Sequence, residues 1–242
     1  MNEEQSKLIE SMKDGLIVSC QAKKDDPIYL PGIVVKMAES AVWGGACCIR
    51  ANTPEDIKSI NEAVELPIIG LWKIHSENSP VFITPTMEAV RAVIEAGADI
   101  IAVDATDRYN AQGKKAFTII EEIKKEFPDI LILADIRNAE EAVNALKLGA
   151  HIVAPTLYRF NDNPKSIDSP DFEMLAKIIR ECEGLGYVFM EGKINTPEEA
   201  VESIYLGAHA VVVGSAITRP HLTTLRYTRK LNKYNKSMPL YY

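Results

Sequence analysis

Short apolar runs alternate along the chain with longer segments in which apolar positions recur at a helical spacing. A short continuous apolar run is typical of a strand that is covered on both faces, as in a parallel sheet. The pattern predicts eight strands, which are GLIVSCQ, ACCIRAN, PIIGLWK, DIIAVDAT, ILILADI, HIVAPTL, YVFMEG and HAVVVGS. Between them lie predicted helices such as TPEDIKSINEAV, AFTIIEEIKKEF and DFEMLAKIIRECEG.

Three segments repeat one helix-and-strand unit. They begin at Thr86, Asn138 and Thr196, and each continues with an acidic first turn, an amphipathic helix, a Gly-Ala stop and a Val/Ile/Ala-rich run. Thr or Asn is a favourable N-cap, and glycine is the usual residue just beyond a helix C-terminus. In the last unit, Asn195 or Thr196 is the expected cap, and Pro197 suits the first helical turn. The repeat therefore indicates a chain built from alternating strands and helices.

The alternation predicts an α/β protein with a (β/α)8 TIM-barrel fold, because eight such units fit a barrel of about 250 residues. We expect a single domain over residues 1–242, with a lead-in helix within residues 1–14 and a C-terminal tail at 236–242. A doubly wound open sheet is the alternative. That fold usually carries a GxGxxG turn after its first strand, and GLIVSCQ has none.

Composition narrows the function classes. The formal net charge of −7 argues against a nucleic-acid partner, and no apolar run approaches the roughly 20 residues of a membrane span. The basic run RYTRKLNK is expected on a solvated face of the last helix. The N-terminal sequence does not resemble a signal or transit peptide, and the four cysteines lack metal-finger spacing. We therefore expect a cytoplasmic protein with reduced thiols and no membrane partner.

Polar residues stand where the predicted strands end. In TIM barrels the chemistry gathers at the C-terminal ends of the strands. These ends are Gln21, Arg50, Lys73, Asp104, Asp135, Thr156, Glu191 and Gly214-Ser215. Taken singly, Arg50 or Asp135 could form a structural ion pair, Gln21 could satisfy a backbone group, and Lys73 could be a surface lysine. Their convergence on one mouth favours an active site, because buried charges are costly unless they are paired.

A phosphate site is predicted at the last two strands. Gly214-Ser215 follows the eighth strand, where barrels often hold a phosphate on backbone N–H groups and a short helix N-terminus. Gly192, after the seventh strand, would supply a neighbouring donor, and Arg219 either reaches the mouth or forms a surface pair. A metal site is not expected, because His151 and His209 stand at strand beginnings, and His75 and His221 lie in predicted loops without a ligand partner.

The chain resembles the N-acetylmannosamine-6-phosphate 2-epimerase family of bacterial sialic acid catabolism from about Gly15 to the last helix. The segments that carry the resemblance are GLIVSCQA, IRAN, LPIIGxxK, VFITPT, ADIIAVDAT, LADI, DFEML, EGKINTPEEA and GAHAVVVGSAITRP. The resemblance implies an isomerase that inverts C2 of a phosphorylated amino sugar. It also implies a cytoplasmic homodimer that uses no metal or cofactor.

The resemblance assigns the catalytic lysine to Lys73 and its carboxylate partner to Glu191. It places Gln21, Arg50, Asp135 and Arg219 in the surrounding substrate-binding network. The implied reaction is opening of the sugar ring, removal of the C2 proton and return of a proton on the other face.

Two loops depart from the family pattern. Lys73 is followed by Ile-His-Ser instead of the family's basic and aromatic residues in KRxY. After the sixth strand the chain reads PTLYRF where the family has TTLSGYT, and Arg159 in this stretch is a candidate phosphate ligand. Two other functions are left open: a different metal-free phosphosugar isomerase or aldolase, with Lys73 as a Schiff base, and a sugar-phosphate-binding barrel without turnover.

Overall fold

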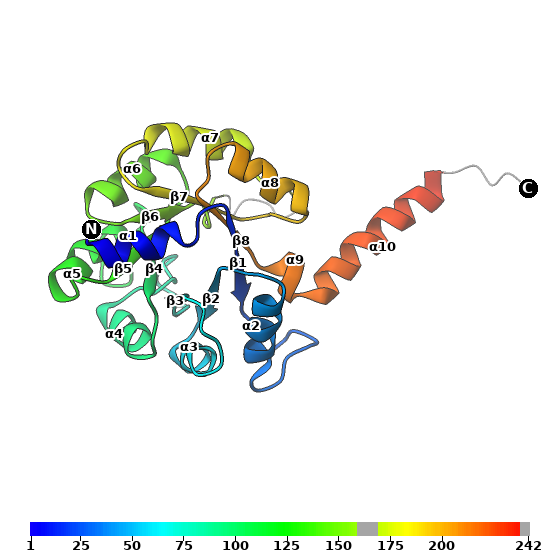
Figure 1. Cartoon of the computed structure of the whole chain (residues 1–242), viewed down its shortest axis with the longest axis horizontal. Coiled ribbons are helices and arrows are strands. Elements are labelled where there is room, and N and C mark those ends of the chain that lie inside the picture. Colours follow the sequence, from blue (N-terminus) through cyan, green and yellow to red (C-terminus); the bar gives the residue numbers. More distant parts are fainter. Residues whose placement is uncertain (159–168, 238–242) are drawn as a thin grey trace, which may run out of the picture.

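The computed structural model describes residues 1–158 and 169–237, which form a closed barrel of eight parallel strands paired in chain order (Figure 1). The expected TIM barrel is therefore confirmed, and every predicted strand is present. The strands are β1 Gly15–Cys20, β2 Cys48–Asn52, β3 Ile68–Leu71, β4 Ile100–Asp104, β5 Leu131–Asp135, β6 Ile152–Ala154, β7 Tyr187–Glu191 and β8 Ala210–Val213. The ladder from β8 back to β1 closes the barrel.

A helix follows each strand and covers the outside of the barrel (Figure 1). The helices are α1 Glu3–Glu10, α2 Ile33–Trp43, α3 Pro54–Asn61, α4 Met87–Glu95, the 3₁₀ turn η1 Ala116–Thr118, α5 Ile119–Glu126, α6 Ala139–Lys147, α7 Phe172–Glu181, α8 Pro197–Tyr205, α9 Ser215–Thr218 and α10 Pro220–Ser237. Among the described residues, no helix is long and apolar enough to cross a membrane.

The three repeated units begin as their sequences predict. Thr86, Asn138 and Thr196 cap α4, α6 and α8, and each side chain accepts the N–H of the residue three positions later. Thr196, rather than Asn195, is thus the cap of α8, and Pro197 opens its first turn. These caps satisfy N–H groups that have no partner within the helix, so the helix starts are set locally by the sequence.

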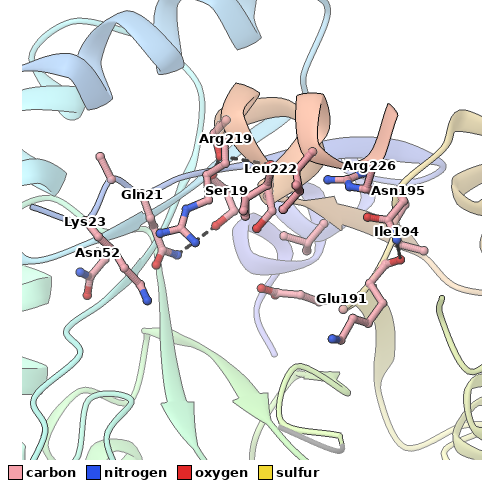
Figure 2. A pocket seen from close by; sticks show the side chains of 18 of the residues that line it. Ser19, Gln21, Lys23, Asn52, Glu191, Ile194, Asn195, Arg219, Leu222 and Arg226 are labelled. Atoms are coloured by element: carbon pink, nitrogen blue, oxygen red, sulfur yellow. Dashed lines mark hydrogen bonds between the residues drawn. The ribbon is translucent and has the colours of Figure 1, made fainter. Parts of the chain in front are cut away.

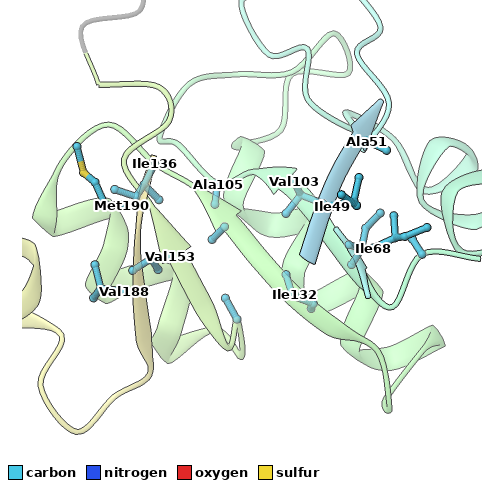
Figure 3. Packing of buried hydrophobic residues seen from close by; sticks show 14 of the residues in the cluster. Ile49, Ala51, Ile68, Val103, Ala105, Ile132, Ile136, Val153, Val188 and Met190 are labelled. Carbon is cyan, nitrogen blue, oxygen red and sulfur yellow. The ribbon is translucent and has the colours of Figure 1, made fainter. Parts of the chain in front are cut away.

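Alternation along each strand divides the apolar side chains between two cores. In β5, Ile132 and Ala134 face the helices, whereas Leu131 and Leu133 face the barrel interior. Figure 3 shows the outer core, in which strand residues such as Ile132 pack beneath the helices. Because side chains alternate with a period of two, Asp135 continues the inward-facing set at the end of β5. The same alternation aims the other polar strand ends into the barrel mouth.

The opposite end of the barrel is closed by α1. Ile9 and Met12 are fully buried and belong to the interior core. His209 Nε2 lies 2.9 Å from the Ile9 carbonyl, and His151 Nδ1 accepts the Ile132 N–H at 3.1 Å. Both histidines directly precede strands and make structural contacts at this end of the barrel, as their positions in the sequence predict. Burial lowers the pKa of His151 to about 4, so its ring is neutral and accepts a hydrogen bond.

The last helix, α10, leaves the barrel and points away from it (Figure 1). His221, which was expected in a loop, lies in the first turn of α10 instead. The predicted C-terminal tail, residues 236–242, falls outside the described residues except where α10 reaches Ser237.

Candidate active site

A cavity of about 500 Å³ opens at the C-terminal ends of the strands. Gln21, Lys73, Glu191 and Arg219 line it, and Figure 2 shows Gln21, Glu191 and Arg219 facing the same space. Gly192, Gly214 and Ser215 line it as well. The structure therefore brings together, on one cavity, residues that are up to about two hundred positions apart in sequence.

Arg50 and Asp135 lie beneath this cavity and do not form part of its lining. Their side chains are 1% and 0% exposed, and Arg50 Nη2 donates to Asp135 Oδ2 at 2.6 Å. Arg50 Nη1 also donates to Glu191 Oε2, and the Thr156 hydroxyl donates to Asp135. The ion pair that was a structural alternative for Arg50 and Asp135 is thus present, and it anchors Glu191 from below.

Lys73 approaches the cavity from the end of β3. Its Nζ donates to Gln21 Oε1 at 2.5 Å, and Gln21 Nε2 in turn donates to Ser19 Oγ at 2.9 Å. Both Gln21 and Ser19 face inward from β1 by the same alternation. The amine is exposed to the cavity, yet protein groups surround it closely. Lys73 is thus held by a neutral partner and stays accessible to a ligand.

The pKa values of the two candidate catalytic groups are displaced toward neutrality. Burial among protein groups, followed by the positive charge of Arg50, lowers the pKa of Lys73 to about 8, against the opposing charges of Glu191 and Asp135. Burial, helped by Asp135, raises the pKa of Glu191 to about 7, against the opposing charges of Arg50 and Lys73. Groups with pKa values near neutrality are suited to giving and taking protons at physiological pH.

The predicted phosphate residues lie at one edge of the cavity. Gly192 has a φ of +123°, a conformation that side chains rarely adopt. Gly214 immediately precedes α9, which begins at Ser215, and a Cβ on Gly214 would stand 3.4 Å from Ser19 Cβ. Both glycines carry no side chain at this edge, so their backbone N–H groups are able to face a bound anion.

Basic side chains extend the same edge outward. Arg219 donates to Asp26 Oδ2 at 2.8 Å, so it reaches the mouth with its charge partly balanced. Lys193, Arg226 and Arg229 also line the cavity. The expectation that the basic run RYTRKLNK only forms a solvated face was therefore incomplete, because α10 places two of its arginines over the mouth (Figure 2 labels Arg226).

Sequence reasoning missed several residues of the mouth. Asn52 ends β2 and lines the cavity, as the alternation from Arg50 would have indicated. Asp26 comes from a loop that carries no motif. Asp104, a predicted strand end, is held by Arg108 Nη2 at 2.6 Å and does not contribute to the lining that is described. Arg159, the candidate phosphate ligand, lies outside the described residues.

Within residues 1–158 and 169–237, no group of three or more His, Cys, Asp or Glu side chains is arranged to hold a metal ion. The arrangement that is present is an acid, an amine and guanidinium groups around an open cavity. Such a set is able to remove a proton, return a proton and stabilise the negative charge that develops between the two steps.

Comparison with known proteins relates the chain to a family of epimerases. Residues 34–233 match the family model described as "Putative N-acetylmannosamine-6-phosphate epimerase". A "Putative N-acetylmannosamine-6-phosphate 2-epimerase" of Caldanaerobacter subterraneus subsp. tengcongensis is 45% identical over 92% of this chain and 93% of its own length. A relative with the same name from Listeria monocytogenes serotype 4b is 41% identical over 93% of this chain and 98% of its own.

A solved structure agrees with these relatives. The N-acetylmannosamine-6-phosphate 2-epimerase of Clostridium perfringens superposes with a TM-score of 0.85 and 39% identity, over 92% of this chain and 95% of that one. A thiamine phosphate pyrophosphorylase of Pyrococcus furiosus shares the fold alone, with a TM-score of 0.57 and 21% identity over 91% of this chain and 96% of that one.

Proposed function

The chain belongs to the N-acetylmannosamine-6-phosphate 2-epimerase family, and we propose that Lys73 and Glu191 move the protons by which it works. It is an isomerase that inverts C2 of N-acetylmannosamine 6-phosphate to give N-acetylglucosamine 6-phosphate. The observation that carries our assignment is the meeting of Lys73 and Glu191 on one cavity, with both pKa values displaced toward neutrality.

The chemistry begins with the sugar ring. The C2–H bond becomes acidic only beside the open-chain carbonyl, so the C1–O5 bond must first break. O5 gains a proton in that step and the O1 hydroxyl loses one. Glu191 is placed for this exchange because it lines the cavity, whereas Asp135 is covered by Arg50 and Thr156. Asp135 therefore acts through Arg50. It holds the guanidinium in place below the substrate and balances its positive charge.

Proton removal at C2 follows. Neutral Lys73 takes the proton, and the C2–H electron pair moves into an enolate whose negative charge rests on O1. The Lys73 and Glu191 pair then returns a proton to the opposite face of C2. Arg50 donates to Glu191 from below, so it stabilises the carboxylate each time Glu191 has released its proton.

The phosphate is held at the edge formed by Gly192, Gly214 and Ser215. Backbone N–H groups in this segment and the start of α9 offer donors, and Arg219 adds a cation that Asp26 orients. Gln21 contributes an amide beside the Lys73 amine, suited to a sugar hydroxyl. This orientation would place the sugar carbons over Lys73 and Glu191.

We also propose the setting in which the enzyme works. The resemblance points to sialic acid catabolism. Cys20, Cys47, Cys48 and Cys182 are free thiols, which supports a reducing compartment such as the cytoplasm. The protruding α10 exposes Tyr227 and Leu231, which stand four positions apart on one face, and this apolar surface supports a homodimer. Sedimentation of the protein and of its Leu231→Glu variant tests this: the dimer should weaken in the variant, and a monomeric wild type would refute it.

The function is tested by a proton NMR time course of N-acetylmannosamine 6-phosphate with the protein in D2O. We expect the gluco epimer to appear with deuterium at C2, and Lys73→Ala to slow it by about 10²- to 10⁴-fold. The fold should survive that change because the amine is exposed to the cavity. Lys36→Ala, at an exposed lysine of α2, is the matched control. An unimpaired Lys73→Ala variant would refute the assignment of Lys73, and borohydride trapping of substrate on Lys73 would indicate Schiff-base chemistry instead.

A further inference from the structure

We propose that Thr84 and Asn52 are positioning residues for Lys73, because together they fix the backbone that carries its amine into the cavity. The proposal rests on the assignment of Lys73 as a proton-moving group. Neither residue belongs to the predicted catalytic set, and Thr84 is buried below the mouth.

The first step of the argument concerns where β3 stops. The ladder between β3 and β4 pairs only Ile69 with Ile100 and Gly70 with Ile101, although β4 continues to Asp104. Beyond that point a returning segment, residues 82–84, lies between the two strand ends. It pairs with residues 72–74 on one side, through an antiparallel bridge between Lys73 and Ile83. On the other side, the Asp104 N–H donates to the Ile83 carbonyl at 3.0 Å.

Thr84 connects the returning segment, residues 82–84, to the chain at the end of β3 and to β4. Its hydroxyl accepts the Trp72 N–H at 3.1 Å and donates to the Ala102 carbonyl at 2.7 Å. Its own N–H donates to the Trp72 carbonyl at 2.8 Å. Both backbone groups of Trp72, the residue before Lys73, are therefore bound by Thr84. Removal of the hydroxyl would leave a buried donor and a buried acceptor without their partner.

Thr84 makes these bonds from an unfavourable backbone conformation. Its φ is +44°, and a β-branched residue at positive φ is a genuine outlier. Such strain is maintained only where surrounding structure over-determines it, and it concentrates at functional sites. Thr53, directly after Asn52, is a second β-branched residue at positive φ, +74°. Both strained residues flank the end of β3.

Asn52 completes the support from the other side. Its Oδ1 accepts the Lys73 N–H at 2.8 Å, and the neighbouring Thr53 N–H donates to the Leu71 carbonyl at 2.9 Å. Asn52 also lies in the lining of the cavity (Figure 2). The backbone on both sides of the Lys73 side chain is thereby fixed, and its Nζ lies 2.5 Å from Gln21. Displacement of a catalytic group by about 1 Å can cost roughly 10²-fold in rate.

The Thr84→Gly variant distinguishes a positioning role of the Thr84 hydroxyl from an effect of backbone strain alone. Glycine adopts positive φ freely, so Thr84→Gly relieves the backbone while removing the hydroxyl. We expect kcat to fall about 10- to 100-fold with KM within about twofold of wild type. Thr84→Ser retains the hydroxyl and should recover most of the lost kcat. The control is Ile178→Ala, which truncates a fully buried side chain of the outer core on α7, away from β3. It should lower the thermal midpoint and leave kcat and its pH profile unchanged.

A measurement without substrate keeps this test independent of the proposed function. Acetylation of Lys73 by acetic anhydride, followed by mass spectrometry across about pH 6 to 10, reports the pKa of the amine, which lies at about 8 in its buried setting. In Thr84→Gly and in Asn52→Ala the freed amine moves away from Arg50 and toward water. Its apparent pKa should therefore rise toward the ordinary lysine range, while Thr84→Ser and Ile178→Ala retain the wild-type value.

The outcomes distinguish the positioning role of Thr84 and Asn52 from the proposed epimerase function. If the wild type does not epimerise the substrate, the proposed function fails, and the labelling still decides the positioning role. If Thr84→Gly and Asn52→Ala alter only thermal stability, as Ile178→Ala does, with labelling and kcat of Thr84→Gly unchanged, the positioning role is overturned. If Thr84→Gly does not fold, Asn52→Ala decides by labelling alone.

Discussion

Arg50 donates from Nη2 to Asp135 Oδ2 over 2.6 Å, and both side chains are almost completely withdrawn from solvent. Loss of Asp135 removes one of the two carboxylates, Asp135 and Glu191, that balance the buried charge of Arg50. We therefore expect Asp135→Ala to reduce the free energy of unfolding by about 3–5 kcal/mol, measured by urea denaturation. Glu126→Ala, which breaks the exposed pair with Arg91, should cost much less. Equal losses in the two variants would contradict the role given to the buried pair.

The raised pKa of Glu191 links stability to pH. Burial, the largest cause, moves this pKa from the ordinary 4.5 to about 7. A carboxyl whose folded pKa is raised favours folding below its unfolded pKa, and this contribution is lost as pH rises through the folded value. The thermal midpoint of wild type should thus fall relative to Glu191→Gln between about pH 4.5 and pH 7, the window set by the two pKa values. A constant difference across that window would show that Glu191 does not titrate abnormally.

Asp26 provides a test of substrate orientation. Its carboxylate accepts from Arg219 at 2.8 Å and also lies 3.5 Å from His221 Nε2. Because a hydrogen bond between charged groups holds Arg219 at the mouth, we expect Asp26→Ala to raise KM roughly 10-fold and to change kcat little. The neighbouring exposed Asp25 allows a matched control, and Asp25→Ala should leave both constants unchanged. A fall in kcat alone would assign Asp26 to the chemical step.

The fold and the strand-end residues were predictable because both follow from local periodicities. Caps at Thr86, Asn138 and Thr196 and the apolar runs after them specify the units, and a period of two aims Lys73 and Glu191 inward. The same period predicts that Arg50 and Asp135 point into the barrel. It does not predict how deeply they are buried, because burial depends on the side chains above them. Contacts made by irregular segments carry no period.

Thr84 illustrates this limit. Its role depends on the chain from Lys73 to Ile83 returning to insert between β3 and β4, a long-range arrangement that no local pattern encodes. The direction of α10 could not be predicted from the sequence either, because its basic residues have the pattern of an ordinary solvated helix face. The residues that the sequence did not predict are therefore those placed by loops and by the departure of a helix from the barrel.

The direction of α10 places Arg226 and Arg229 at the cavity mouth. Their positive charge predicts a reaction rate that depends on salt concentration. Both line the mouth and make no ion pair within the described residues, so their charge is available to attract a phosphorylated sugar. We expect Arg226→Gln with Arg229→Gln to lower kcat/KM at low ionic strength with little change in kcat. The deficit should shrink as salt is raised, because the screening length falls from about 10 Å at 0.1 M to about 3 Å at 1 M. Lys230→Gln removes the same charge from an exposed position of α10 outside the lining, and it should have little effect. A deficit that persists unchanged at high salt would instead indicate direct contact with the bound substrate.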